Sequence, residues 1–204
     1  MKILVLGLGN DLWGDDGVGL RAVRRLEEQW SSETGPGQAG VEVDFKECYV
    51  SGAALLDFIH GYEALVIIDT ILKPAAGAAA GRVTIHEAAE ARDLPGPSPH
   101  YISVAQTLVL GRALGLKVPA AAKLVAVEVE GGFRLGEGLT QGMTARLPAI
   151  VEAARTVVLG LAEAARAGAN PPLESQPRTD GDMTNTGQGP APLRGEQENA
   201  RRHS

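Results

Sequence analysis

Short apolar runs and helically spaced apolar positions alternate along the chain, and this alternation is the first indication of its fold. Residues 3–6 and 64–68 are continuous apolar runs, and Asp69 closes the second. The first run predicts a buried strand, and the second is typical of a strand buried on both faces of a parallel sheet. Between them, a spacing of three or four residues predicts an amphipathic helix that starts near Asp15 or Asp16. Its buried face is expected to carry Leu20, Val23, Leu26 and Trp30.

The rest of the pattern predicts three more strands and three more helices. We expect strands at residues 41–46, 82–87 and 123–129, and helices at residues 51–61, 102–115 and 140–167. Ser51 suits the cap of the first of these helices and Gly61 suits its end. Pro148 predicts a bend in the last helix.

This order of elements predicts one α/β domain with helices on both faces of its sheet. We place the domain at residues 1–168. From Pro171 onward the chain is rich in Pro, Gly and polar residues and has few large apolar ones. Such a segment buries too little surface to offset the entropy of ordering it, so we expect residues 169–204 to form a disordered C-terminal tail.

Composition and charge narrow the class of protein. With 204 residues, 44% of them hydrophobic, the chain is long enough for one well-packed domain. Its net charge of −6 gives no electrostatic footprint for nucleic acid or an anionic membrane. We find no apolar run near the roughly 20 residues that span a bilayer, and no signal-peptide pattern. One cysteine, Cys48, excludes an internal disulfide and indicates a buried thiol in a reducing cytoplasm.

Gly7-Leu8-Gly9, directly after the first predicted strand, is a candidate nucleotide site because a Gly-x-Gly turn opens dinucleotide-binding domains. That fingerprint needs a third glycine three positions later, where this chain has Leu12. A nucleotide-binding oxidoreductase, which NAD or NADP would stabilise against heat, is therefore a disfavoured hypothesis.

Asp16, Asp69 and His100 form a second candidate site. Asp16 follows the first predicted strand, Asp69 closes the strand at residues 64–69, and His100 lies at a junction between a loop and a helix. Ligands of open α/β sheets bind outside the carboxyl ends of the strands, and two carboxylates with an imidazole suit a borderline divalent metal ion. Each residue also has a simpler interpretation. Asp16 suits a helix cap, Asp69 a turn at a strand end, and His100 a surface or capping histidine.

A serine or cysteine nucleophile is a third candidate with little support. Ser51, Ser98 and Ser103 have no Gly-x-Ser-x-Gly elbow around them. Nothing in the sequence around Cys48 indicates a lowered thiol pKa. We therefore do not expect a catalytic triad of either kind.

With these residues identified, the chain resembles the hydrogenase maturation endopeptidases, peptidase family M52. The likeness covers about residues 1–167 and is strongest at residues 7–19, which read GLGNDLWGDDGVG. This stretch is similar to the family's opening signature of Gly-x-Gly-Asn-x-Leu, two variable residues, an acidic pair and Gly-x-Gly. A second match is the strand that ends in Asp69, and a third is the SPH sequence that ends in His100. The GLT sequence at residues 138–140 is a weaker match.

The resemblance implies a three-layer fold with a mostly parallel five-stranded sheet between helices. Members of this family trim the C-terminal extension of the large subunit of [NiFe] hydrogenases after nickel has been inserted. The resemblance therefore implies that Asp16, Asp69 and His100 are the catalytic, nickel-contacting residues, with the nickel supplied by the precursor. It also implies a cytoplasmic, monomeric endopeptidase whose partner is that precursor. The family position that Asp16 matches is often glutamate, so aspartate keeps the charge with a shorter reach.

One stretch departs from the family pattern. Many members carry an Asp-Gly-Gly segment after the second strand that is thought to contact substrate, whereas residues 47–52 here read ECYVSG. Cysteine and tyrosine side chains would block the close backbone approach that glycines permit. This departure motivates an alternative function: a non-catalytic maturation protein that recognises a metal-loaded hydrogenase client without cleaving it.

Overall fold

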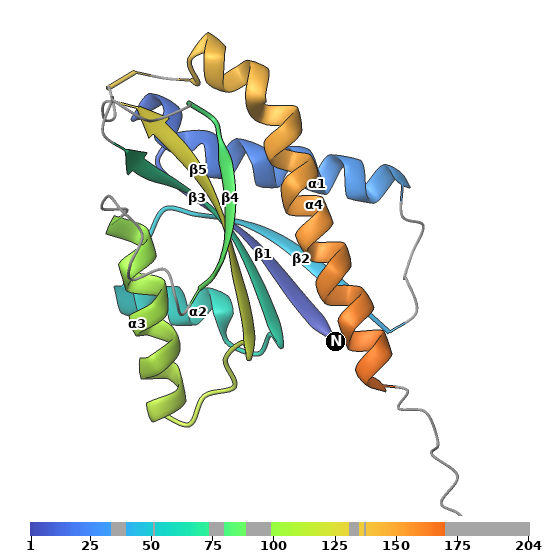
Figure 1. The fold of residues 1–204 in the computed structure, drawn as a ribbon. Coiled ribbons are helices and arrows are strands. Elements are labelled where there is room, and N and C mark those ends of the chain that lie inside the picture. The colour runs from blue at the N-terminus through green and yellow to red at the C-terminus, as the bar shows by residue number, and fades with distance from the viewer. Residues whose placement is uncertain are drawn as a thin grey trace, which may run out of the picture. The chain divides into compact units, whose positions relative to one another are not determined.

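The structure is a computed structural model that describes residues 1–33, 40–50, 52–73, 80–88, 99–130, 135–136 and 138–169 (Figure 1). Within these ranges, the side chains of residues 33, 73, 99–103, 130 and 169 are outside the description. The expected tail at residues 169–204 lies almost wholly outside the described residues, so it stays a prediction. The same holds for Ser51 as a helix cap.

Five strands form one mostly parallel sheet, which confirms the expected α/β class. Their order across the sheet is β2-β1-β3-β5-β4. Among the described strands, β4 runs antiparallel to β5, and the other pairings are parallel. The strands are β1 (Lys2–Leu8), β2 (Glu42–Cys48), β3 (Ala64–Lys73), β4 (Val83–Glu87) and β5 (Ala121–Glu130).

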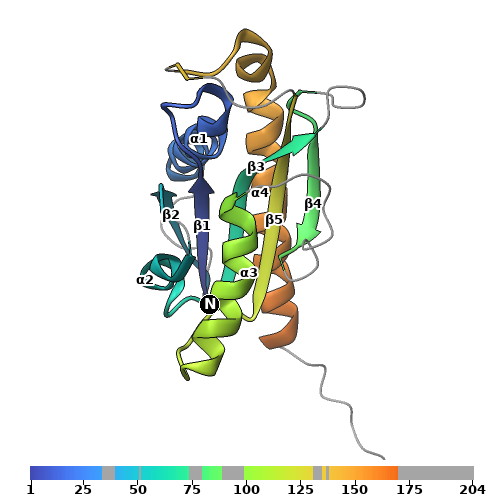
Figure 2. The same cartoon turned by 90° about the vertical axis from the view of Figure 1, so that its left-hand side faces the viewer.

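Helices cover both faces of the sheet and give the expected three layers (Figures 1 and 2). One face is covered by α1 (Val18–Glu33) and α4 (Gln141–Ala169), and the other by α2 (Leu56–Ile59) and α3 (Pro99–Ala113). Two 3₁₀ turns, η1 (Gly14–Gly17) and η2 (Gly52–Leu55), lead into α1 and α2. None of the described helices is long and apolar enough to cross a membrane.

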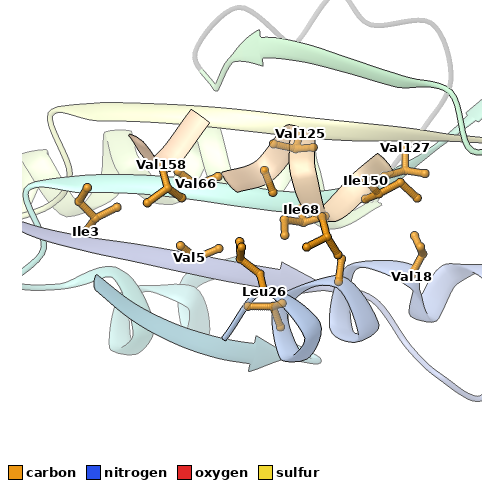
Figure 3. Close-up of a cluster of buried hydrophobic side chains, with 14 of the residues drawn as sticks. Ile3, Val5, Val18, Leu26, Val66, Ile68, Val125, Val127, Ile150 and Val158 are labelled. Atoms are coloured by element: carbon orange, nitrogen blue, oxygen red, sulfur yellow. The ribbon is translucent and has the colours of Figure 1, made fainter. Parts of the chain in front are cut away.

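The core between the sheet, α1 and α4 explains why the first apolar run is continuous. Figure 3 shows Ile3 and Val5 of β1 in this core, where they lie with Leu26 of α1. The alternate residues Leu4 and Leu6 are buried in the other core, under α2 and α3. Because successive side chains of a strand point to opposite faces, a strand covered on both faces needs an apolar residue at every position.

The helix face predicted from Leu20, Val23, Leu26 and Trp30 is the face that packs on the sheet. The first three side chains are buried, and Trp30 is partly buried against this core. The Trp30 ring also packs at a tilt on the ring of Phe45 from β2, with 5.9 Å between the ring centroids. Tilted aromatic pairs of this kind stabilise a fold by more than the burial of their apolar area alone.

The prediction that Asp69 closes its strand is wrong, because β3 continues to Lys73. The pairing of β3 with β1 ends at Ile68, whereas its pairing with β5 continues as far as Lys73 opposite Glu130. The residues beyond Asp69 begin with Thr70 and Ile71, which are β-branched and suit a strand paired on one edge. Asp69 therefore lies within β3, at the first position of this strand that no longer pairs with β1.

Candidate functional site

The chain crosses from one side of β1 to the other, and two of the predicted site residues, Asp16 and Asp69, lie on the segments at this crossing. From β1 the chain moves outward to β2 and then returns to β3 on the opposite side of β1. Ligands of open α/β sheets bind at such a switch point, outside the carboxyl ends of the strands. Asp16 lies in η1, after β1, and Asp69 lies on β3 just past its pairing with β1. At this level η1 packs against β3.

Thr70 connects the two carboxylates. Its hydroxyl donates a hydrogen bond of 3.0 Å to Asp16 Oδ1, and its backbone N–H donates one of 2.8 Å to Asp69 Oδ1. Both side chains are buried, Asp16 with 5% of its surface exposed and Asp69 with none. A buried carboxylate is costly unless hydrogen bonds compensate for lost water, so the bonds from Thr70 help to fix both groups. Asp16 and Asp69 are thus linked through one residue, Thr70, which hydrogen-bonds to both.

His100, the third predicted site residue, is described by its backbone alone. It is the second residue of α3, whose amino end points toward the carboxyl ends of the parallel strands (Figure 2). Two turns further along α3, the Thr107 hydroxyl donates a hydrogen bond of 2.8 Å to the Gly52 carbonyl of η2. This contact fastens α3 beside the end of β2. The direction of the His100 side chain stays a prediction.

The donor chemistry of the two aspartates suits a divalent cation. Among the side chains that the structure describes, no three of His, Cys, Asp and Glu are grouped closely enough to hold a metal ion. Asp16 and Asp69 supply oxygen ligands, which hard and borderline divalent ions accept, and an added imidazole would favour a borderline ion. The two aspartates alone are fewer donors than the three-residue set that the sequence predicts, so their role as metal ligands stays a prediction.

Glu128 is a buried carboxylate near this end of the sheet that the sequence analysis did not single out. It is fully buried on β5 and pairs in register with Ile71, two residues beyond Asp69. Side chains in register on neighbouring parallel strands point to the same face, so Glu128 and Asp69 share a face of the sheet. Its signal in the sequence is a glutamate between the apolar residues 124–127 and Val129.

Asp15, next to Asp16, serves a different contact. Its two carboxylate oxygens accept hydrogen bonds from the backbone N–H and the hydroxyl of Thr140, at 2.7 and 2.9 Å. Thr140 Oγ1 in turn accepts a hydrogen bond of 3.2 Å from the Met143 N–H and so caps α4. The two neighbouring aspartates therefore make different contacts. Asp15 ties η1 to the start of α4, while Asp16 meets Thr70.

The glycines of the opening motif let η1 and α1 lie directly on the strand ends. A Cβ atom at Gly9 would be 2.0 Å from the Asp16 carbonyl oxygen. A Cβ atom at Gly19 would be 2.2 Å from the Leu8 carbonyl oxygen and 2.4 Å from that of Ile68. Any side chain at either position would push the loop that carries Asp16 away from β1 and β3. A Cβ atom at Gly7 would likewise be 2.3 Å from the Gly19 carbonyl oxygen, so close packing alone accounts for the Gly-x-Gly sequence.

The segment that departs from the family pattern is tied to α1. Arg24 donates two hydrogen bonds of 2.5 Å to the two carboxylate oxygens of Glu47, and the Tyr49 hydroxyl donates one of 3.0 Å to the same group. The bond from Arg24 is the main reason that the pKa of Glu47 lies below its ordinary value, and the bond from Tyr49 lowers this pKa further. Glu47 is thus held as a charged anchor for the start of this segment.

Cys48 is a buried thiol, as predicted. Its Sγ donates a weak hydrogen bond of 3.5 Å to the Val50 carbonyl. Burial raises the pKa of the Cys48 thiol, and the nearby charge of Asp69 also raises it. A raised pKa keeps the sulfur protonated, so the structure gives no support to a cysteine nucleophile.

Comparison with known sequences gives a short match. No family profile matches the chain. Among curated proteins, the hydrogenase expression/formation protein HupD of Thiocapsa roseopersicina is 34% identical over 70 residues. These residues are 34% of this chain and 28% of HupD, so the match spans less than a third of that relative.

Comparison with solved structures extends the likeness over most of the domain. The hydrogenase maturating endopeptidase HybD from E. coli is 28% identical, with a TM-score of 0.58 over 80% of this chain and 94% of HybD. The [NiFe] hydrogenase maturation protease HybD from Thermococcus kodakarensis is 27% identical, with a TM-score of 0.57 over 77% of this chain and 99% of its own. The α/β fold predicted from the sequence is shared with both proteins.

Proposed function

We propose, from the confirmed likeness of this chain to the hydrogenase maturation endopeptidases, that it removes the C-terminal extension of a [NiFe] hydrogenase large-subunit precursor after nickel insertion. The observation that carries this proposal is the placement of Asp16 and Asp69 on Thr70, at the switch point of a fold shared with E. coli HybD. The sequence match to HupD, a hydrogenase expression/formation protein, supports the same process.

In this proposal Asp16, Asp69 and His100 contact the nickel ion of the bound precursor. The nickel belongs to the substrate, and the three side chains are the oxygen and nitrogen donors that a borderline divalent ion accepts. A divalent ion polarises a carbonyl group or a bound water and so lowers the barrier to hydrolysis. The part of the protein is to hold its carboxylates in place, which the hydrogen bonds from Thr70 support. The scissile peptide is then oriented next to the metal.

An incomplete ligand set explains why cleavage would wait for nickel. Two carboxylates and one imidazole leave coordination positions open, and the precursor fills these with its own ligands. A precursor without nickel offers the two aspartates no cation to bind, so its C-terminal peptide is not positioned for attack. The two carboxylates and the imidazole then make cleavage depend on inserted nickel, and they also form part of the hydrolytic site.

The test compares nickel-loaded and nickel-free precursor. Purified protein is incubated with each form, and the released C-terminal fragment is identified by mass spectrometry. We expect the fragment from nickel-loaded precursor alone. Equal release from both forms would contradict the role of nickel, and no release from either would contradict the endopeptidase. A stable complex with uncleaved precursor, unaffected by Asp69→Asn, would instead indicate the non-catalytic maturation protein.

We further propose that the protein acts in the cytoplasm and as a monomer. The reducing compartment is supported by a chain whose one cysteine is a buried, protonated thiol. The proposal of a monomer is based on the resemblance to the family. Gel filtration of the full chain, with and without precursor, tests the second point.

A further inference from the structure

Exposed apolar side chains gather around the candidate site. Of the ten large hydrophobic side chains that are exposed in the described ranges, five lie in the segments that follow β1, β2 and β5. Single exposed apolar residues are ordinary, but a group of them beside a site marks an interaction surface. These five are Leu12, Trp13, Tyr49, Val50 and Leu135.

Leu12, Trp13 and Leu135 lie on two segments that are hydrogen-bonded to each other, and we call these three residues the apolar platform. Trp13 and Gly136 form a parallel bridge. The Gly14 N–H donates to the Gly136 carbonyl at 2.9 Å, and the Gly136 N–H donates to the Leu12 carbonyl at 3.0 Å. Figures 1 and 2 show the two segments, in blue and ochre, side by side beyond the carboxyl end of β1.

The backbone beneath the platform is fixed while its side chains stay in solvent. Leu12 is 56% exposed, Trp13 44% and Leu135 77%. The bonds between Asp15 and Thr140 hold the same two segments together a few residues further along. Apolar groups on a preorganised backbone bind a partner with less loss of conformational entropy than the same groups on a loose loop.

We infer that the apolar platform is a docking surface for the hydrogenase large-subunit precursor, an inference that rests on the proposed function. Trp13 precedes Asp16 by three residues, and Asp16 is only 5% exposed. A metal ion held within a folded protein reaches so recessed a carboxylate only if the two protein surfaces meet around it. A specific protein interface covers roughly 800 Å² on each partner. An interface centred on Asp16 therefore covers the platform.

The charges beside the platform define the surface that fits it. Asp11 and Asp15 flank Leu12 and Trp13 on the same loop, and the nearby Arg24 is paired with Glu47. A complementary surface is apolar at its centre and basic at its rim, around the metal. A second copy of this chain fits poorly, because platform against platform would bring the aspartates of both copies together.

The chain offers a matched control for the platform. Leu114 is 61% exposed, which lies between the values for Leu12 and Leu135, but it follows α3 at the opposite end of that helix from His100. A loss of binding through general changes in surface hydrophobicity would affect Leu114→Ser as much as Leu135→Ser. If the precursor docks at the platform, binding is lost on substitution of Leu12 or Leu135 and is kept in Leu114→Ser.

The experiment uses the full chain and purified large-subunit precursor. Cleavage of nickel-loaded precursor gives KM and kcat, and equilibrium binding of nickel-free precursor gives a Kd without turnover. For Leu12→Ser/Leu135→Ser we expect KM and Kd to rise at least about tenfold, with kcat within about twofold of the unchanged protein. Leu114→Ser is expected to leave all three within about twofold. Leu135→Ser alone is the second variant if the double variant fails to fold, since its side chain packs least.

The outcomes separate the platform from the proposed function. If the unchanged protein cleaves the precursor and the platform variants match it in KM and Kd, the platform inference is overturned and the endopeptidase stands. An equal loss in Leu114→Ser overturns it as well. If the unchanged protein binds the precursor but does not cleave it, and the platform variants lose binding, the inference stands and the endopeptidase fails. An unchanged protein that neither binds nor cleaves overturns both.

Discussion

Thr70 and Asp16 meet through a hydrogen bond of 3.0 Å, although 54 residues separate them in the chain. The bond joins β3 to the turn after β1, and the backbone N–H of the same threonine donates a hydrogen bond to Asp69. One threonine thereby contacts both carboxylates on which the proposed chemistry depends.

Thr70→Val removes the hydroxyl and keeps the shape of the side chain. The Asp16 carboxylate, nearly fully buried, then loses a donor, which typically costs about 1–3 kcal/mol of unfolding free energy. We expect a loss of that size in urea unfolding, and at least about tenfold slower release of the precursor fragment because Asp16 is no longer held in position. Thr70→Ser restores the hydroxyl and is the control. Equal rates for the valine and serine variants would show that the hydrogen bond does not position Asp16.

Gly19→Ala tests the close packing of α1 on the strand ends. The new Cβ would meet the carbonyl oxygens of Leu8 and Ile68 at 2.2 and 2.4 Å, and backbone atoms cannot move aside cheaply. We expect a loss of about 3 kcal/mol or more in unfolding free energy. Gly160→Ala is the matched control, because no heavy atom lies within 4 Å of its Cβ position in α4. That variant is expected to gain roughly 0.5–1 kcal/mol from the higher helix propensity of alanine.

The ion pair of Arg24 and Glu47 predicts a stability difference that depends on pH. The folded state lowers the pKa of Glu47 below 4.5, mainly through Arg24. A group with a lowered folded-state pKa contributes stability that is complete above its unfolded-state pKa and is lost as the pH falls through the folded-state value. We therefore expect Arg24→Gln to cost about 0.5–1 kcal/mol at neutral pH, since both side chains are partly exposed, and less at about pH 3.5.

Arg25→Gln provides the comparison for this prediction. Arg25 pairs with Glu28 at 3.4 Å, and both side chains are at least 60% exposed. An exposed pair of this kind contributes little, so its removal is expected to change the unfolding free energy by about 0.3 kcal/mol or less at either pH. A cost for Arg24→Gln that stays constant from neutral to acidic pH would show that the pair with Glu47 is not its source.

The raised pKa of Cys48 predicts a thiol that resists alkylation in the folded protein. Its sulfur is fully buried, and the pKa shift keeps it protonated where free cysteines begin to ionise. Iodoacetamide at about pH 8 is expected to label Cys48 only after unfolding in denaturant, with no loss of activity beforehand. Rapid labelling of the folded protein together with loss of cleavage would point to a catalytic cysteine.

The sequence predicted the architecture because burial leaves a local pattern. The continuous apolar run in β1 and the helical spacing of Leu20, Val23 and Leu26 both follow from one element and the face it buries. The extension of β3 past Asp69 has no such local cause. It depends on pairing with β5, for example of Asp69 with Ala126, 57 residues later in the chain. A strand boundary placed at the charged residue was therefore the error to expect from local sequence.

The candidate site was predictable in its residue types and less so in its contacts. Asp16 and Asp69 follow from their places after apolar runs of the sequence, whereas nothing near Thr70 marks it as their common donor. Asp15 and Asp16 look alike in the sequence, and they are separated only by the contact of Asp15 with Thr140, 125 residues away. Hydrogen bonds over such separations appear once the chain is folded.

Cleavage of nickel-loaded precursor by carboxamide variants tests the central claim most directly. Asp16→Asn and Asp69→Asn remove one carboxylate each, and Asp57→Asn removes an exposed carboxylate on α2 as a control. We predict that fragment release, followed by mass spectrometry, falls at least about a hundredfold for the first two variants and stays within about twofold of the unchanged protein for the third. Release at the unchanged rate by Asp16→Asn and Asp69→Asn would contradict the account.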